Sequence, residues 1–163
     1  MTLLAVAVSG RGLVDPAEPV LRADDEALLR GRAAFETVRV YGGRPFRLDE
    51  HLDRLDGSAR AIGLPPVRQD ELRGLLRQAL DAAARPDAVL RLYWTPGETA
   101  LALVSDVPDG LDELHARGQA LVTLLGVRAE VPWLLPGVKS TSYAVNMAAE
   151  AEAKRRGADD AVF

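Results

Sequence analysis

A hairpin signal in residues 33–48 constrains the fold of this chain more than any other feature. The segment reads AAFETVRVYGGRPFRL, in which apolar and polar residues alternate up to a Gly-Gly pair at 42–43. Alternation with a period of two predicts a strand with two distinct faces, and the Gly-Gly pair predicts a tight turn into a short return strand. One face carries Phe35, Thr37, Arg39 and Tyr41, and the other carries Glu36, Val38 and Val40. The chain must therefore build a sheet around this hairpin.

The rest of the first hundred residues alternates strands with helices. Residues 3–8 read as a strand, and the Gly-, Pro- and Asp-rich segment 10–31 reads as a long loop. Apolar residues at helical spacing predict a helix capped by Asp49 that ends at Gly63, and a second helix over about 70–84. A second hairpin follows around Pro96-Gly97. This order predicts an α+β fold.

The second part of the chain begins after a polar, Gly-containing stretch, which places a domain boundary near residues 108–118. The pattern then predicts a strand over 119–127 and a helix over about 142–156, with basic residues in its last turn and Gly157 as its stop. The final residues, DDAVF, predict a strand within which the chain ends. We therefore expect this chain to be a fragment, or to be completed by another polypeptide.

Composition excludes several classes of protein. There is no cysteine, and the two histidines lie far apart, so we expect neither disulfides nor a metal site. A net charge of -4 and a pI near 5.2 argue against nucleic-acid binding. No segment is long enough for a membrane span, and the apolar run at 3–8 lacks the basic residues of a signal peptide. We expect a cytoplasmic protein that binds neither nucleic acid nor membrane.

Lys139 is the first candidate for chemistry. Of twenty basic residues only two are lysines, Lys139 and Lys154. Lys154 has an ordinary place near the end of the predicted helix, whereas Lys139 stands in a loop between Pro-Gly and Ser-Thr-Ser. A desolvated lysine can act as an amine nucleophile and an arginine cannot, so Lys139 is a candidate for binding an aldehyde cofactor. A solvated loop lysine is the alternative, and spacing alone favours it.

Arginines and one histidine supply the next candidates. Arg54 lies beside the apolar stripe of its helix, where its fork could bind a phosphate or pair with a carboxylate. His51, one turn earlier, is expected to be a satisfied structural residue. Arg39 and Arg91 lie within strands, and each could bind a substrate carboxylate or close an internal ion pair.

Two stretches together resemble the class IV aminotransferases, the pyridoxal-phosphate enzymes of fold type IV. They are FETVRVYGGRPFRLDEHLDRLDGSARAIGL and GVKSTSYAVNMAAEAEAKRRGADDAVF. The resemblance implies a two-domain fold like that of D-amino-acid aminotransferase. Residues 1–115 would form its small N-terminal α/β domain, and residues 116–163 would begin the larger cofactor-binding domain. The family's glutamate that faces the pyridine nitrogen is expected just beyond Phe163.

The resemblance also assigns roles to residues. Lys139 corresponds to the Schiff-base lysine and proton shuttle, and Arg54 to the arginine that binds the phosphate of pyridoxal 5'-phosphate. Tyr143 falls where several members place a tyrosine that faces the cofactor oxygen. Phe35 takes the position of an aromatic residue that lines the substrate pocket, and Arg91 lies on a strand that contributes a pocket residue in some members.

The resemblance implies a lyase or a transaminase that acts on a small amino substrate, within a homodimer. We expect 4-amino-4-deoxychorismate lyase, which releases 4-aminobenzoate and pyruvate, or a close aminotransferase. An amino-acid aminotransferase of branched-chain or D-amino-acid type is the alternative, although Pro96 stands where the D-amino-acid enzymes carry an arginine. A non-catalytic remnant that binds a partner is a third possibility, and it predicts no aldehyde binding.

Overall fold

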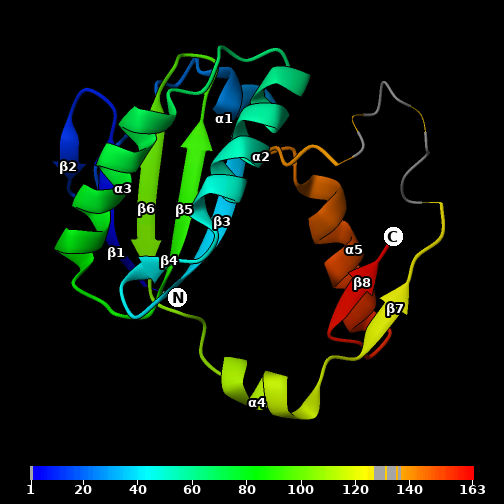
Figure 1. Cartoon of the computed structure of the whole chain (residues 1–163). Helices are drawn as coiled ribbons and strands as arrows, with labels where there is room; N and C mark the ends of the chain where they lie inside the picture. Colours follow the sequence, from blue (N-terminus) through cyan, green and yellow to red (C-terminus); the bar gives the residue numbers. More distant parts are fainter. Residues whose placement is uncertain (1, 127–130, 132–134, 136) are drawn as a thin grey trace. The chain divides into compact units, whose positions relative to one another are not determined.

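The structure is a computed structural model that describes residues 2–126, 131, 135 and 137–163. The chain divides into two compact units (Figure 1). The first comprises Met1–Val107 together with Gly137–Thr141, and the second comprises Pro108–Pro136 together with Ser142–Phe163. Residues 137–141, which include Lys139, therefore belong to the first unit although they lie far from it in the sequence.

The first unit is built on an antiparallel sheet of six strands in the order β2-β1-β6-β5-β3-β4. Its strands are β1 (Leu3–Val8), β2 (Gly12–Val14), β3 (Ala34–Tyr41), β4 (Arg44–Pro45), β5 (Ala88–Trp94) and β6 (Ala100–Ser105). Its helices are α1 (Glu26–Arg30), α2 (Leu48–Ala61) and α3 (Gln69–Ala83). Helices α2 and α3 lie over one face of the sheet, α2 against β3 and α3 against β1 and β6 (Figure 1).

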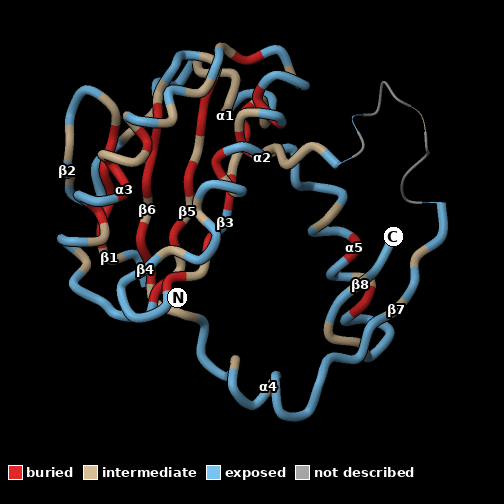
Figure 2. The backbone as a smooth tube through the Cα atoms, viewed as in Figure 1, coloured by how far each residue is buried: buried red, intermediate tan, exposed pale blue. Residues whose placement is uncertain are grey.

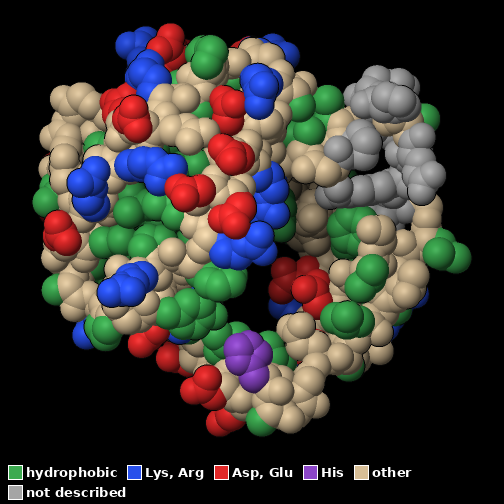
Figure 3. Space-filling view, viewed as in Figure 1, with side chains coloured by type: hydrophobic (Ala, Val, Ile, Leu, Met, Phe, Trp, Pro, Cys, Tyr) green, Lys and Arg blue, Asp and Glu red, His purple; other side chains and the backbone are tan. Residues whose placement is uncertain are grey.

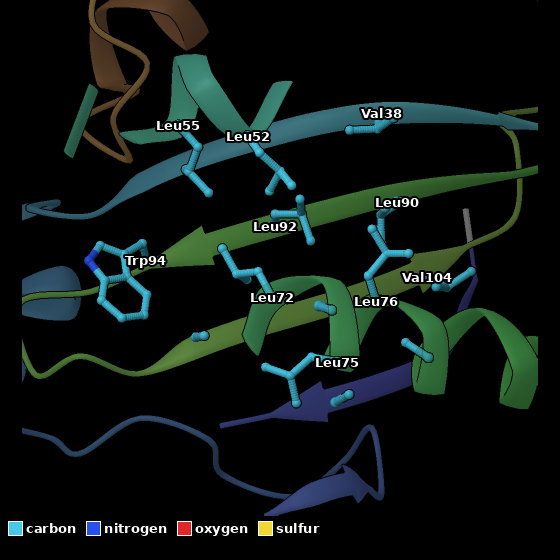
Figure 4. Close-up of a cluster of buried hydrophobic side chains, with 14 of the residues drawn as sticks. Val38, Leu52, Leu55, Leu72, Leu75, Leu76, Leu90, Leu92, Trp94 and Val104 are labelled. Atoms are coloured by element: carbon cyan, nitrogen blue, oxygen red, sulfur yellow. The ribbon is translucent and has the colours of Figure 1, made fainter. Parts of the chain in front are cut away.

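The core lies between that face and the two helices. Figure 2 shows the buried residues along the strands and along the sides of α2 and α3 that face them. Leucines of both helices interdigitate with strand residues and with Trp94, as Figure 4 shows. The Trp94 indole is fully buried and donates its N–H to the carbonyl oxygen of Pro65, at 2.8 Å. Burial of this apolar surface is the main term that stabilises the unit.

The hairpin prediction is confirmed. Strands β3 and β4 pair with Tyr41 opposite Arg44, and both turn glycines adopt positive φ, 53° at Gly42 and 77° at Gly43. Only glycine takes up such a pair of conformations without strain, which is why Gly-Gly marks this turn. On β3, Glu36, Val38 and Val40 are buried and face the helices.

Two local predictions are wrong. Asp49 does not cap α2, because the helix begins at Leu48 after Arg47, which has φ 49° and makes no capping hydrogen bond through its side chain. The segment predicted as a long loop contains β2 and α1, and Asp25 caps α1 through a hydrogen bond from the Ala27 N–H. Pairing with β1 stabilises β2 although its composition is typical of a loop.

The second unit contains α4 (Leu111–Arg117), β7 (Leu121–Thr123), α5 (Ala144–Arg155) and β8 (Asp160–Val162). Helix α4 occupies the stretch that was expected to be a linker. Strands β7 and β8 pair in parallel, with Val122 opposite Ala161. The strand predicted over 119–127 is confirmed only at Leu121–Thr123, and its last residue, Val127, lies outside the described residues.

Positively and negatively charged side chains are interspersed on the exposed surface of the first unit. Figure 3 shows basic side chains interspersed with carboxylates on the visible face. Many of these residues pair, as Arg68 does with Glu71 at 2.6 Å and Arg73 with Asp49 at 2.6 Å. Exposed pairs of this kind contribute little to stability. No helix in the described part of the chain is long and apolar enough to cross a membrane.

Candidate functional site

The segment that carries Lys139 pairs with the beginning of β3. The Phe35 N–H donates to the Lys139 carbonyl oxygen at 3.1 Å, and the Thr141 N–H donates to the Ala33 carbonyl oxygen at 2.9 Å. Ala34 and Ser140 form the antiparallel bridge between these two bonds. The sheet thus gains a short extra segment at the open edge of β3, which fixes the backbone on both sides of Lys139.

This pairing sets the direction of the Lys139 side chain. In an antiparallel ladder, residues directly opposite each other project on the same face, so Lys139 shares the face of Phe35. The Nζ atom of Lys139 lies 4.0 Å from the centroid of the Phe35 ring. Phe35 in turn stacks on Tyr93 of β5, with ring centroids 5.7 Å apart and an interplanar angle of 17°. The amine therefore lies against Phe35, the nearer ring of a wall of two aromatic rings.

Burial against this wall lowers the pKa of Lys139, because a desolvated ammonium is disfavoured. The carboxylate of Glu36 acts in the opposite direction and raises the pKa, and the guanidinium of Arg54 lowers it. The net result is a pKa below the ordinary lysine value. Lys139 thus lies within electrostatic range of both groups, and its amine is deprotonated more readily than that of an exposed lysine.

On the opposite face of β3, Glu36 lies in a cluster of charged and polar side chains from α2. Nε and Nη2 of Arg54 donate to Oε1 and Oε2 of Glu36, both at 2.6 Å. Nδ1 of His51 lies 2.9 Å from Oε2 of the same carboxylate. Glu36 is fully buried, whereas the Arg54 side chain is 54% exposed. The cluster therefore runs from the core of the unit to its surface.

Burial alone would raise the pKa of Glu36, but hydrogen bonds from Arg54 and His51, together with their charges, outweigh it and lower the pKa below the usual glutamate range. The hydrogen bond with Glu36 likewise raises the pKa of Arg54. Glu36 is therefore a carboxylate paired with a guanidinium. The expectation that His51 is a satisfied structural residue agrees with its hydrogen bond to Glu36.

A serine joins the helix of Arg54 to the segment of Lys139. The Lys139 N–H donates to Oγ of Ser58 at 3.2 Å, and Ser58 is buried. Ser58 lies four residues after Arg54, so both side chains project from the same side of α2. One turn of α2 thus binds the backbone of Lys139 through Ser58, and the previous turn carries the exposed guanidinium of Arg54.

The remaining predicted residues fall outside this cluster. Arg91 of β5 lies directly opposite Thr37, on the face that carries Phe35 and Tyr93, where its charge tends to lower the pKa of Tyr93. Arg39 is structural, since Nη1 donates to the Val40 and Ala88 carbonyl oxygens at 2.6 and 3.0 Å. Tyr143 immediately precedes α5 in the second unit, where it is partly exposed.

Sequence reasoning did not identify Glu36 as part of a site. The signal was present, because alternation along the strand placed a carboxylate on the same face as Val38 and Val40. A charge on a buried face requires a partner. Among the described residues there is no group of three or more His, Cys, Asp or Glu side chains suited to a metal ion.

Comparison with known proteins identifies relatives of this arrangement. The amino-transferase class IV family matches residues 33–163, which include both β3 and the Lys139 segment. A bifunctional aminodeoxychorismate lyase / D-amino acid transaminase from Mycobacterium tuberculosis is 36% identical over 93% of this chain. A chloroplastic D-amino-acid transaminase from Arabidopsis thaliana is 30% identical over 88% of it.

A solved structure shows the same fold. The structure of a hypothetical aminotransferase from Mycobacterium tuberculosis in its PLP-bound form superposes with a TM-score of 0.87 and 34% identity, covering 98% of this chain. The chain spans 61% of that protein, and 57% and 41% of the two curated relatives.

Proposed function

Because the chain belongs to the class IV aminotransferases, a family of pyridoxal-phosphate enzymes, we propose that it binds pyridoxal phosphate through Lys139 and Arg54. The observation that carries this proposal is that Ser58, one turn after Arg54 on α2, accepts a hydrogen bond from the backbone of Lys139, whose amine has a pKa lowered by burial. An aldehyde that bears a phosphate requires one group of each kind.

The residues of the site fit this cofactor. Nη1 of Arg54 donates to no acceptor within the described part of the chain, so its N–H groups remain available to phosphate oxygens. The lowered pKa of Lys139 favours the free amine that bonds to an aldehyde carbon. When bound, the cofactor supplies an electron-withdrawing ring that takes up negative charge from the substrate.

Each residue then has a defined task. Nζ of Lys139 would hold the aldehyde of the cofactor, and as a free amine it would take and return a proton at the substrate. The Phe35–Tyr93 wall excludes water from that amine. Arg91, on the same face, would bind a substrate carboxylate, and Tyr143 is the residue that would donate a hydrogen bond to the cofactor oxygen. The assignments of Arg91 and Tyr143 rest on the family resemblance.

For the reaction, we favour 4-amino-4-deoxychorismate lyase, which eliminates pyruvate and leaves 4-aminobenzoate. The Mycobacterium tuberculosis relative bears that activity in its name, together with D-amino acid transamination. The second activity makes a transaminase the alternative for this chain. Both reactions need the same lysine, so the site alone does not choose between them. We further propose a homodimer in the cytoplasm, as the family resemblance implies.

Product analysis tests the function. Purified protein with excess pyridoxal phosphate is incubated with 4-amino-4-deoxychorismate, and 4-aminobenzoate and pyruvate are quantified. We expect both products in equal amounts, and we expect Lys139→Ala to abolish them while Lys154→Arg leaves them unchanged. Keto-acid formation from D-amino acids with α-ketoglutarate, without release of 4-aminobenzoate from 4-amino-4-deoxychorismate, would assign the transaminase. Absence of both reactions from protein that is saturated with cofactor would refute the proposal.

A further inference from the structure

The carboxylate of Glu36 is the most deeply buried charge in the first unit. Its neighbours along the buried face of β3 are Ala34, Val38 and Val40, all fully buried. A carboxylate in such surroundings carries a large desolvation cost unless every oxygen is hydrogen-bonded. An apolar residue would fill this position without that cost, so the presence of a glutamate calls for an explanation beyond packing.

The hydrogen bonds of Glu36 fix the plane of the Arg54 guanidinium. Both carboxylate oxygens bind the Nε–Nη2 edge of Arg54 in a two-point contact, with each distance 2.6 Å. This geometry fixes the orientation of the guanidinium plane, whereas a single hydrogen bond would allow the plane to rotate. His51 Nδ1, 2.9 Å from Oε2, is a further partner of the same carboxylate and helps to hold it in place.

The edge of the fork that Glu36 does not use points away from the core. The Arg54 side chain is 54% exposed although its partner is fully buried. Within the residues that the structure describes, Nη1 binds no protein acceptor. A pair that served only stability would not need a partner with two-point geometry and an exposed donor edge. The buried half of the guanidinium is anchored, and the exposed half is held ready for a ligand.

We propose that Glu36 is a positioning residue that orients Arg54 for the phosphate of the cofactor. This inference rests on the proposed function, because it requires that Arg54 binds that phosphate. Glu36 itself touches no cofactor atom and acts only through the guanidinium. Preorganisation of this kind increases affinity by removing the cost of ordering a flexible side chain at the moment of binding.

The charge of Glu36 also provides a way to separate positioning from an effect on Lys139. Glu36 raises the pKa of Lys139, so its replacement by glutamine leaves the Lys139 amine deprotonated more readily than before. Aldehyde binding at Lys139 therefore does not weaken when the carboxylate is removed. A loss of cofactor affinity in Glu36→Gln must then arise at the phosphate.

The test compares pyridoxal phosphate with pyridoxal, which carries the same aldehyde and ring but no phosphate. Dissociation constants are measured by the absorbance of the bound aldehyde. The dissociation constant for pyridoxal divided by that for pyridoxal phosphate gives a ratio that reports the phosphate contact alone. In Glu36→Gln the amide presents N–H groups toward the guanidinium and breaks the two-point contact. We expect the preference for pyridoxal phosphate to fall by about tenfold or more, by analogy with the loss that follows removal of a partner that orients a metal ligand, with pyridoxal affinity unchanged or higher.

Matched variants complete the experiment. Glu71→Gln removes an arginine-paired carboxylate of the exposed surface, Arg68–Glu71 at 2.6 Å, and is expected to leave the ratio unchanged. In an Arg54→Gln background, Glu36→Gln is expected to add no further loss, because its effect passes through Arg54. An equal further loss in that background would overturn the inference. If Glu36→Gln does not fold, Glu36→Asp, which keeps the charge on a shorter side chain, must lower the ratio.

The outcomes distinguish this inference from the proposed function. Wild-type protein that prefers pyridoxal phosphate, together with Glu36→Gln protein that keeps the full preference, would overturn the role of Glu36 and leave the function standing. Wild-type protein that binds both aldehydes equally, or neither, would overturn the role of Arg54 and the proposed function with it.

Discussion

At the scale of the residue, the two lysines of this chain occupy opposite environments. Lys139 lies against the Phe35 ring, and burial lowers its pKa. Lys154 is exposed on α5, where Nζ lies 2.5 Å from Oε1 of Glu150, and the hydrogen bond and charge of that carboxylate raise its pKa. The sequence contains no third lysine. The reactivity of Lys139 can therefore be compared directly with that of Lys154 in the same protein.

This contrast predicts selective acylation. Only the deprotonated amine reacts, and as long as the pH lies well below the pKa, the deprotonated fraction rises about tenfold for each unit by which the pKa falls. We expect a small acylating reagent at pH 8 to modify Lys139 faster than Lys154, as measured by peptide mass spectrometry over time. Glu150→Gln should speed the reaction of Lys154 and leave that of Lys139 unchanged. Faster modification of Lys154 in the wild type would contradict the environment assigned to Lys139.

At the scale of the element, α2 performs two tasks with adjacent residues. Leu52 and Leu55 are fully buried against the sheet, while the partly exposed Arg54 between them binds the buried Glu36 carboxylate. Packing of the leucines fixes the rotation of the helix about its axis. The direction of the Arg54 side chain thus depends on the core as well as on its own hydrogen bonds.

Truncation of a core leucine in α2 tests this dependence. Leu55→Ala leaves a cavity, and we expect it to lower the free energy of unfolding by about 2–5 kcal/mol. Leu28→Ala removes an exposed leucine of α1, which is 64% accessible, and we expect a change within about 0.5 kcal/mol. Urea denaturation followed by tryptophan fluorescence measures both. Equal effects of the two variants would show that α2 does not pack as described.

Local patterns predicted the elements of the site better than their assembly. The period of two placed Phe35 and Glu36 on opposite faces, and the helical period placed Arg54 beside an apolar stripe, as observed. The partners were not predictable, because Glu36 and Arg54 are 18 residues apart and Lys139 and Ser58 are 81 apart. The start of α2 was misplaced because no side chain caps it, so the sequence carries no capping signal there.

At the scale of the whole molecule, each of the two units has its own stabilising contacts. In the second unit, Nη1 and Nη2 of Arg117 donate to the two carboxylate oxygens of Asp159 at 2.9 and 2.8 Å. The Ala120 N–H donates to Oδ2 of the same carboxylate at 2.8 Å. These bonds join the end of α4 to the residue that precedes β8. They hold together the beginning and the end of this unit.

The contact between Arg117 and Asp159 makes the stability of the second unit sensitive to acid. Hydrogen bonds from Arg117 and Ala120 lower the pKa of Asp159 to about 2. Because the pKa in the folded protein lies below the usual aspartate value of 3.8, the ionised carboxylate contributes stability above about pH 4. That contribution is lost as the pH falls toward 2. We expect the Asp159 carboxyl carbon to titrate near pH 2 by NMR, and Arg117→Gln to raise that midpoint. A midpoint near 4 in the wild type would contradict the contact.

The central claim is that Lys139 carries the cofactor, and the site of covalent attachment tests it most directly. Protein incubated with pyridoxal phosphate is reduced with borohydride, digested and mapped by mass spectrometry. The account predicts that the reduced cofactor is found on Lys139, that Arg54→Gln lowers its amount at limiting cofactor, and that Lys154 stays unmodified. Label on Lys154 in equal amount, or no label on Lys139 at saturating cofactor, would contradict it.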